Sequence, residues 1–267
     1  MRRVLGRVRA RLTSATVAAL TPALAIAGVV GVAGCGAAGG APGNVPTRHT
    51  VVVLAASSLT EPMTAIAKDF ESSHPGTDVQ VSFAASSTVV SQVNQGAPAD
   101  LIALAGKAAA GPLKKSLIIG NTPSLASNTL EIATPPDNPG KVNAIADLSR
   151  PNLKVVLCAA TVPCGRAAAT ALSAAGVVAH VVSYETDVKA TLTKVRLGEA
   201  DAAIVYHSDV LSAGAQVHGV PIPASVNQTL DYPLIRLTDD PTTLALMAYI
   251  LSDHGQKRLR DSGFLTP

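Results

Sequence analysis

The chain has 267 residues, of which 48% are hydrophobic and only 3% aromatic, and its formal net charge at pH 7 is +3. Five of its 21 Lys and Arg residues lie within residues 1–34, which contain no acidic residue, so 16 basic and 18 acidic residues remain beyond that segment. The slightly acidic remainder, with four Tyr, three Phe and no Trp, argues against a basic, aromatic surface for nucleic acid.

Residues 1–34 have the pattern of a secretory signal peptide. An Arg-rich start is followed by an apolar stretch of small residues and then by Val-Ala-Gly before Cys35. This ending resembles the bacterial lipobox, in which the cysteine is lipid-modified and becomes the first residue of the mature chain. We therefore expect a lipid anchor at Cys35, a flexible linker over 35–48, and a domain held at the extracytoplasmic face of the cell membrane. A plain signal peptide with an incidental cysteine, or a single transmembrane anchor, is the alternative.

From residue 50 onward, strand-like and helix-like patterns alternate. Strands are predicted over 51–54, 79–83, 100–104, 130–134, 154–157, 177–182, 202–206, 219–222 and 234–237. Helices are predicted over 59–72, 87–94, 106–115, 142–148, 166–175, 188–196, 241–252 and 254–261. The strand segments are apolar without strict alternation, which is typical of strands buried on both faces. The sequence therefore predicts an α/β fold of mostly parallel sheets flanked by helices.

Two segments rich in Pro, Gly and Asn, 134–140 and 221–228, bracket a central block. Such segments are expected where a chain leaves one domain, builds a second and returns. The sequence therefore predicts two lobes, the first of residues 49–130 and 231–267 and the second of residues 131–230. The two crossover segments between them would act as a hinge.

Two junctions between a predicted strand and a predicted helix have similar sequences, AASSLT at 55–60 and FAASST at 83–88. Ligands of α/β sheets lie beyond the carboxyl ends of strands, and the free N–H groups at a helix start attract anions. With the Ser hydroxyls added, the two junctions favour an oxyanion site built without charged side chains. Taken singly, the serines of either junction have an ordinary alternative role as helix N-caps.

Three later segments offer further hydrogen-bond donors. The turn VPCG at 162–165 leads into a predicted helix and directs the N–H of Cys164 outward along the helix axis. The segment YETD at 184–187 supplies the cap of the next helix, which leaves the N–H of Val188 free. Tyr206 carries a hydroxyl to the carboxyl edge of a strand. A core aromatic with its hydroxyl at the surface is the alternative for Tyr206.

Cys158 and Cys164 lie close together in a chain that is expected to reach an oxidising compartment, where cysteines can pair. The sequence predicts a local disulfide that closes a strand end onto a helix start. Two unpaired buried thiols are the alternative. A metal site is not expected, because no cluster of His or carboxylate side chains accompanies the two cysteines.

Enzyme signatures are missing from the sequence. It has no Gly-x-Ser-x-Gly elbow, no Walker-type phosphate loop, no Gly-x-Gly-x-x-Gly and no His at the spacing of a paired base. Glu61 and Asp187 are expected to be first-turn helix residues. The sequence therefore argues against an enzyme. A secreted α/β hydrolase with Ser58 or Ser86 as its nucleophile is the alternative.

Seven short motifs occur in the order and spacing of the molybdate-binding proteins of ABC transporters. They are AASSLT, FAASST, QGAPAD at 95–100, VPCG, IVYHSD at 204–209, DYP at 231–233 and SGF at 262–264. The chain resembles this family from about residue 51 to about residue 265. The resemblance implies a type II periplasmic-binding-protein fold of two lobes. It also implies a solute-binding lipoprotein that captures molybdate or tungstate between the lobes and delivers it to an ABC permease in the membrane.

In that family, hydrogen bonds hold the oxyanion, without direct bonds from the protein to the metal. The resemblance assigns the ligand-binding groups of this chain to the hydroxyls of Ser58, Ser86 and Tyr206 and to the backbone N–H groups of Cys164 and Val188. No other cofactor is implied, and a monomer is expected. Cys164 stands where the family often has a smaller residue, but the contact belongs to the backbone.

Donors of this kind suit a fully deprotonated tetrahedral dianion, which offers only acceptors. Hydrogen phosphate would bring an O–H group that such a site leaves unpaired. Another oxyanion, sulfate foremost, or a small organic anion is the alternative ligand. The side chains of Arg166 and Lys189 are expected to extend into solvent, away from the ion.

Overall fold

The computed structural model describes residues 49–267; the predicted signal peptide, the predicted lipidation at Cys35 and the predicted linker lie outside the described residues. The strands are β1 (His49–Ala56), β2 (Thr77–Ala84), β3 (Leu101–Ala103), β4 (Ser124–Thr134), β5 (Val155–Cys158), β6 (Val181–Glu185), β7 (Ala202–Tyr206), β8 (His218–Pro221) and β9 (Thr229–Arg236). The α-helices are α1 (Thr60–Ser73), α2 (Ser86–Asn94), α3 (Pro163–Ala174), α4 (Val188–Arg196), α5 (His207–Ala213), α6 (Pro241–Leu251) and α7 (Asp253–Asp261). Short 3-10 helices lie at Ser57–Leu59, Lys107–Ala110, Lys115–Leu117, Ile145–Ser149 and Gly214–Gln216. None of these helices combines the length and the apolar composition that a membrane crossing requires.

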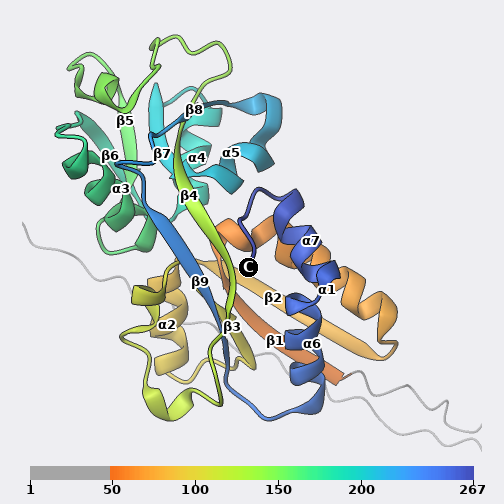
Figure 1. The fold of residues 1–267 in the computed structure, drawn as a ribbon. Helices are drawn as coiled ribbons and strands as arrows, with labels where there is room; N and C mark the ends of the chain where they lie inside the picture. Colours follow the sequence, from red (N-terminus) through yellow and green to blue (C-terminus); the bar gives the residue numbers. More distant parts are fainter. Residues whose placement is uncertain (1–48) are drawn as a thin grey trace, which may run out of the picture. The chain divides into compact units, whose positions relative to one another are not determined.

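The strands of the described part form one mixed sheet in the order β2-β1-β3-β9-β4-β7-β5-β6, with β8 paired to β4. Parallel pairing, as predicted, joins β1 to β2 and β3, and joins β5 to β6 and β7. The antiparallel pairs all involve β4 or β9. These two strands carry the chain from one parallel block to the other and back, so they run side by side in opposite directions (Figure 1).

The crossing strands β4 and β9 are longer than predicted. β4 pairs first with β9 and then with β7 and β8, while β9 pairs first with β4 and then with β3. The sequence predicted only their apolar ends, 130–134 and 234–237, because the halves that pair with each other carry polar residues. Ser127 Oγ, for example, donates to an Asp231 carboxylate oxygen at 3.0 Å. A pair of hydrogen-bonded strands therefore connects the two blocks.

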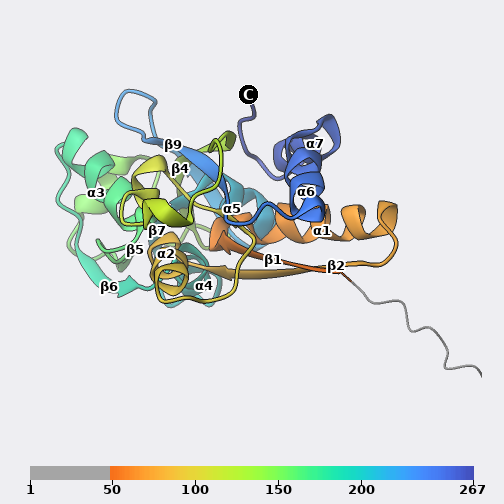
Figure 2. The same ribbon diagram turned by 90° about the horizontal axis from the view of Figure 1, so that it is seen from below.

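Helices cover both faces of the block around β1. Val51 and Val53 pack in a core shared with α1, α6 and α7, whereas Leu54 packs against α2, because alternate residues of a strand point to opposite faces. Figure 2 shows α1 and α6 together on one side of β1 and β2. In the second block, α3 and α4 contact β5 and β7, and α5 contacts β4 and β7. Burial on both faces explains the apolar strands and confirms the predicted α/β class.

Two predicted helices are shorter and tighter than expected. The segment 106–115 forms only the 3-10 helix Lys107–Ala110 and leads into a second one at Lys115–Leu117, because Gly106 has a φ of +88° and Pro112 interrupts the run. The segment 142–148 forms only the 3-10 helix Ile145–Ser149. In addition, β6 begins at Val181 rather than at residue 177.

The short helix α5 was not predicted, because its seven residues are too few to show an apolar period. A start signal was nonetheless present. Asp209 stands three residues after the N-cap Tyr206, and its Oδ2 accepts the backbone N–H of Tyr206 at 3.3 Å.

Candidate oxyanion-binding site

All five residues that the sequence singled out line one small pocket. Each of them is at most 4% exposed. They are Ser58, Ser86, Cys164, Val188 and Tyr206, and the pocket is completed by Ala56, Ser57, Ala85, Ala105, Val162, Pro163 and Asp187. The volume of the pocket is about 10 Å³. A pocket of that size excludes a large organic molecule.

Helix starts converge on this pocket. Three of these helices have an N-cap residue whose side chain makes no capping hydrogen bond. These residues are Ala56 before the 3-10 helix Ser57–Leu59, Ala85 before α2 and Val162 before α3. The first N–H groups of a helix have no partner inside it, so they are left available to a ligand. The positive ends of α2, α3 and α4 add to the attraction for an anion.

The alternative that the serines are ordinary N-caps is wrong for this structure. The N-cap of α2 is Ala85, and Ser86 is the first residue inside that helix. The N-cap of the 3-10 helix is Ala56, and Ser58 is the second residue inside it. Their hydroxyls are buried against the pocket instead of closing the helix ends.

The Ser86 hydroxyl is held as a donor. Its Oγ accepts the backbone N–H of Ala105 at 2.8 Å. A serine oxygen that already accepts one hydrogen bond has its own proton left to give, so the Ser86 O–H can donate to a ligand in the pocket.

Tyr206 contributes an unpaired hydroxyl. Its OH is buried and has no hydrogen-bond partner among the described residues. Burial raises the pKa of the phenol well above its usual value, so the group is neutral and keeps its proton. The alternative, a hydroxyl at the surface, is therefore wrong. A buried O–H without a partner costs about 1–3 kcal/mol, which an acceptor in the pocket would relieve.

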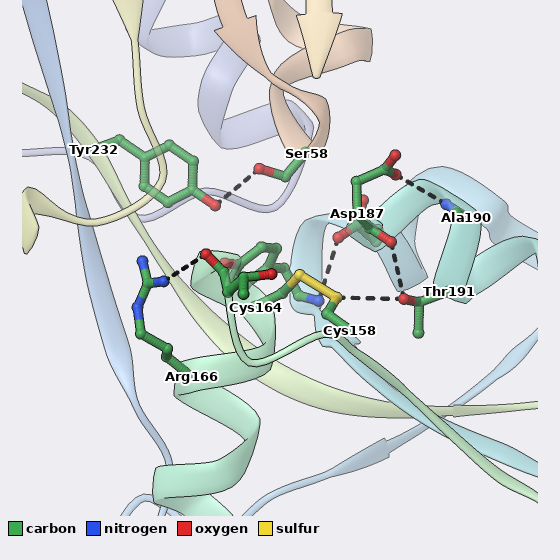
Figure 3. The surroundings of a disulfide bond; sticks show 11 residues. Ser58, Cys158, Cys164, Arg166, Asp187, Ala190, Thr191 and Tyr232 are labelled. Carbon is green, nitrogen blue, oxygen red and sulfur yellow. Dashed lines mark hydrogen bonds between the residues drawn. A yellow bond between two sulfur atoms is a disulfide. The ribbon is translucent and has the colours of Figure 1, made fainter. Parts of the chain in front are cut away.

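A disulfide fixes the turn that presents Cys164. Cys158 ends β5 and Cys164 lies in the first turn of α3, and their sulfurs are bonded with the Cα atoms 5.8 Å apart (Figure 3). Gly165 follows directly, and a Cβ at this position would overlap the Ala159 carbonyl oxygen. The loop between the cysteines is thus folded tightly onto the helix start, and Cys164 lies in the pocket wall.

The pocket wall contains no Lys or Arg. Its one charged residue, Asp187, is the N-cap of α4 and accepts the Ala190 N–H at 3.0 Å (Figure 3). Arg166 is exposed, as expected, and donates to the Thr161 carbonyl at 2.9 Å. It lines a wider adjoining cleft of about 400 Å³ together with Lys107.

The expectation that Lys189 extends into solvent is wrong. Its Nζ lies 2.8 Å from Glu61, 3.1 Å from Asp209 Oδ1 and 3.2 Å from Ser212 Oγ. Asp209 is fully buried, and burial raises the pKa of its carboxyl to about 6 even though Lys189 acts to lower it. A buried carboxylate needs a cation beside it, and the first turn of α4 supplies one.

Sequence reasoning gave no role to Tyr232, which lies on β9. Its hydroxyl is 2.9 Å from Ser58 Oγ, and both side chains are buried (Figure 3). The DYP motif contributed to the family resemblance, but only the three-dimensional pairing of β9 with its neighbours brings the phenol to the serine.

The geometry is suited to binding and gives no support to Ser-based catalysis. The hydrogen-bond partner of Ser58 is Tyr232 and that of Ser86 is a backbone N–H, so neither hydroxyl of this pocket contacts a His that could act as a base.

Residues 51–265 match the family of bacterial extracellular solute-binding proteins. Over 252 residues the chain is 35% identical to the molybdate-binding protein ModA of Mycobacterium tuberculosis, a match that covers 93% of this chain and 97% of the relative. The substrate-binding domain of a putative molybdenum ABC transporter from Clostridium difficile aligns with a TM-score of 0.63 at 25% identity, over 82% of this chain and 99% of that one. The periplasmic molybdate-binding protein of Azotobacter vinelandii shares the fold, with a TM-score of 0.71 at 16% identity over 81% and 99% of the two chains.

Proposed function

The chain belongs to the family of bacterial extracellular solute-binding proteins, and we propose that it binds molybdate, or the similar ion tungstate, for import by an ABC transporter. The observation that carries the proposal is the small pocket lined by neutral donors, one of which, the Tyr206 hydroxyl, has no partner among the described residues. The similarity to molybdate-binding relatives supports the same ligand.

Five groups would hold the ion. The hydroxyls of Ser58, Ser86 and Tyr206 and the backbone N–H groups of Cys164 and Val188 each have a proton to donate to an oxygen of a tetrahedral dianion. A dianion that offers only acceptors satisfies all of them, and the helix starts offset its charge.

Hydrogen phosphate fits this donor set poorly. Its O–H needs an acceptor, and the only carboxylate in the pocket wall, Asp187, is turned toward the start of its own helix, where Oδ1 accepts the Ala190 N–H. Leaving that O–H unpaired should weaken binding by about 1–3 kcal/mol.

The proposal includes two lobes that close on the ion. Ser58 and Ser86 belong to the lobe of residues 49–130 and 231–267, whereas Cys164, Val188 and Tyr206 belong to the lobe of residues 131–230. An ion that bonds to both sets would favour the closed arrangement over an open one.

The proposed site of action is the extracytoplasmic face of the cell membrane. A lipid at Cys35 would tether the monomeric binding domain there, and the membrane subunits of the transporter would receive the ion from it. The protein would bind and release its ligand without chemical change.

Calorimetric titration of the non-lipidated chain tests the proposed ligand. We expect tight binding of molybdate and tungstate, weaker binding of sulfate, and the weakest binding of phosphate at pH 7. Sulfate bound more tightly than molybdate would make the protein a sulfate-binding member of the family. Absence of binding by all four ions would refute the oxyanion site.

A further inference from the structure

We propose that Tyr232 is a positioning residue that turns the Ser58 hydroxyl toward the ligand and thereby makes the site select fully deprotonated anions. The inference rests on the proposed function of the pocket. Tyr232 is not part of the pocket wall, so it would act through Ser58, whose oxygen lies 2.9 Å from the phenol oxygen. Figure 3 shows the two hydroxyls pointing at each other.

The direction of this hydrogen bond matters because each hydroxyl has a single proton. If Ser58 donates to Tyr232, the serine turns a lone pair toward the pocket, and an anion there is repelled. If Tyr232 donates to Ser58, the serine proton is free to point into the pocket, and Ser58 becomes a donor to the anion.

The surroundings of Tyr232 favour donation by the phenol. Burial raises the pKa of Tyr232 above its usual value, so the phenol keeps its proton. The oxygen of the neighbouring Asn128 amide already accepts the Thr129 N–H at 3.0 Å, and its nitrogen donates to Ser208 Oγ at 2.8 Å. Ser58 Oγ is the hydrogen-bond partner of the Tyr232 hydroxyl among the described residues, so we take it as the acceptor of the phenol proton.

Ser86 shows the same arrangement with a backbone donor. The Ala105 N–H fills one acceptor position of Ser86 Oγ, as the Tyr232 O–H would fill one of Ser58 Oγ. A backbone N–H can only donate, whereas a phenol can turn round. The site would therefore have one serine that is fixed by the main chain and one that depends on a side chain from β9.

This dependence has a consequence for selectivity. Without the Tyr232 O–H, the Ser58 hydroxyl can rotate so that its oxygen accepts a hydrogen bond from the ligand. The O–H of a hydrogen phosphate ion then has a partner. A phenylalanine at this position keeps the ring between its aromatic neighbours, the Tyr206 and Phe264 rings, with centroid distances of 6.3 and 5.3 Å. Tyr232→Phe therefore removes the donor and leaves the packing in place.

Titration of the whole non-lipidated chain with molybdate and phosphate tests the proposal. We expect Tyr232→Phe to weaken molybdate binding about tenfold while phosphate binding stays constant or strengthens, so that the molybdate-to-phosphate affinity ratio falls at least tenfold. Tyr249→Phe, the same chemical change on α6 outside the pocket wall, should leave the ratio unchanged. An unchanged ratio in a folded Tyr232→Phe protein overturns the proposal.

A double variant separates an effect through Ser58 from a general loosening of the fold. If Tyr232 acts through Ser58, adding Tyr232→Phe to Ser58→Ala changes the molybdate affinity by less than twofold, whereas independent effects would multiply. If the wild type prefers sulfate, the proposed ligand is wrong, and the same comparison with sulfate in place of molybdate still decides the role of Tyr232.

Discussion

Lys189 Nζ lies 3.1 Å from a carboxylate oxygen of Asp209, a residue with no exposed surface. The lysine is on the first turn of α4, beside Val188 of the pocket wall, and the aspartate is on α5 behind Tyr206. Glu61 on α1, at 2.8 Å, completes the cluster from the other block of the sheet. These charges lie next to the pocket without entering its wall.

Removing the lysine should destabilise the fold more than it weakens binding. Lys189→Met leaves the buried Asp209 carboxylate without its cation, so we expect the free energy of unfolding at pH 7.5 to fall by about 3 kcal/mol. Urea denaturation measures this change. Lys194→Met is the matched control, because Lys194 pairs with the exposed Glu199 and its loss should change the free energy of unfolding much less. Equal effects of the two substitutions would contradict the role given to Lys189.

Asp209 should make stability depend on pH in a specific direction. Its folded-state pKa of about 6 lies above the ordinary value of 3.8, so the folded state binds the proton more tightly than the unfolded state. The contribution of this group therefore favours folding below about pH 4 and becomes less favourable as the pH rises to about 6. Denaturation of wild type and Asp209→Asn between pH 4 and 7.5 measures it. The free energy of unfolding of the wild type should fall relative to that of the variant between pH 4 and 6, and the two curves should run parallel above pH 6. Curves that are parallel over the whole range would refute the raised pKa of Asp209.

Ser58 and Ser86 should matter for the ligand more than for the fold. We expect Ser58→Ala and Ser86→Ala each to weaken molybdate binding by about 1–3 kcal/mol, because each removes a charge-assisted hydrogen bond. Calorimetry and thermal melting together provide the measurement. Ser87→Ala, next in sequence but outside the pocket wall, is the control. Unchanged affinity with a lower melting temperature would mean that the two serines serve only the helix starts.

The disulfide should be detectable by thiol titration. A denatured chain that lacks Cys35 should show no free thiol until a reductant is added. Reduction should lower the free energy of unfolding by about 2 kcal/mol, since the Cys158–Cys164 bridge closes a short loop. Two thiols before reduction would contradict the pairing.

The charge of Arg166 near the pocket should contribute less to molybdate affinity than the neutral phenol of Tyr206 within the pocket. Arg166→Ala should change molybdate affinity by less than about 1 kcal/mol, because the side chain is exposed and outside the pocket wall. Tyr206→Phe should have a larger effect, since it removes a donor from a buried site. A large, steeply salt-dependent loss for Arg166→Ala would instead indicate an anion held by a salt bridge.

Much of the fold could be predicted from the sequence where local pattern and tertiary burial agree. The segments 188–196 and 202–206 have the predicted boundaries, because an Asp cap and an unbroken apolar run mark them. The long strands β4 and β9 could be predicted only in part, since their polar halves are strands only because they pair with each other.

The lining of the pocket could be predicted where the main chain dictates it, whereas contacts between residues distant in sequence could not. Ser58, Ser86, Cys164, Val188 and Tyr206 all follow strand ends or begin helices, so motif spacing brings them into view. The role of Tyr232 and the inward turn of Lys189 depend on contacts across more than one hundred positions of sequence, to Ser58 and to Glu61, and no local pattern records such contacts.

The close approach of the Ala159 carbonyl to Gly165 has a consequence at the level of the gene. Every missense change in the codon for Gly165 adds at least a Cβ atom, and that atom would overlap main-chain oxygen rather than a side chain that could move aside. The helix start and the loop would have to separate, and the Cys164 N–H would move with them. Position 165 should therefore admit only synonymous mutations in any population that depends on this binding site.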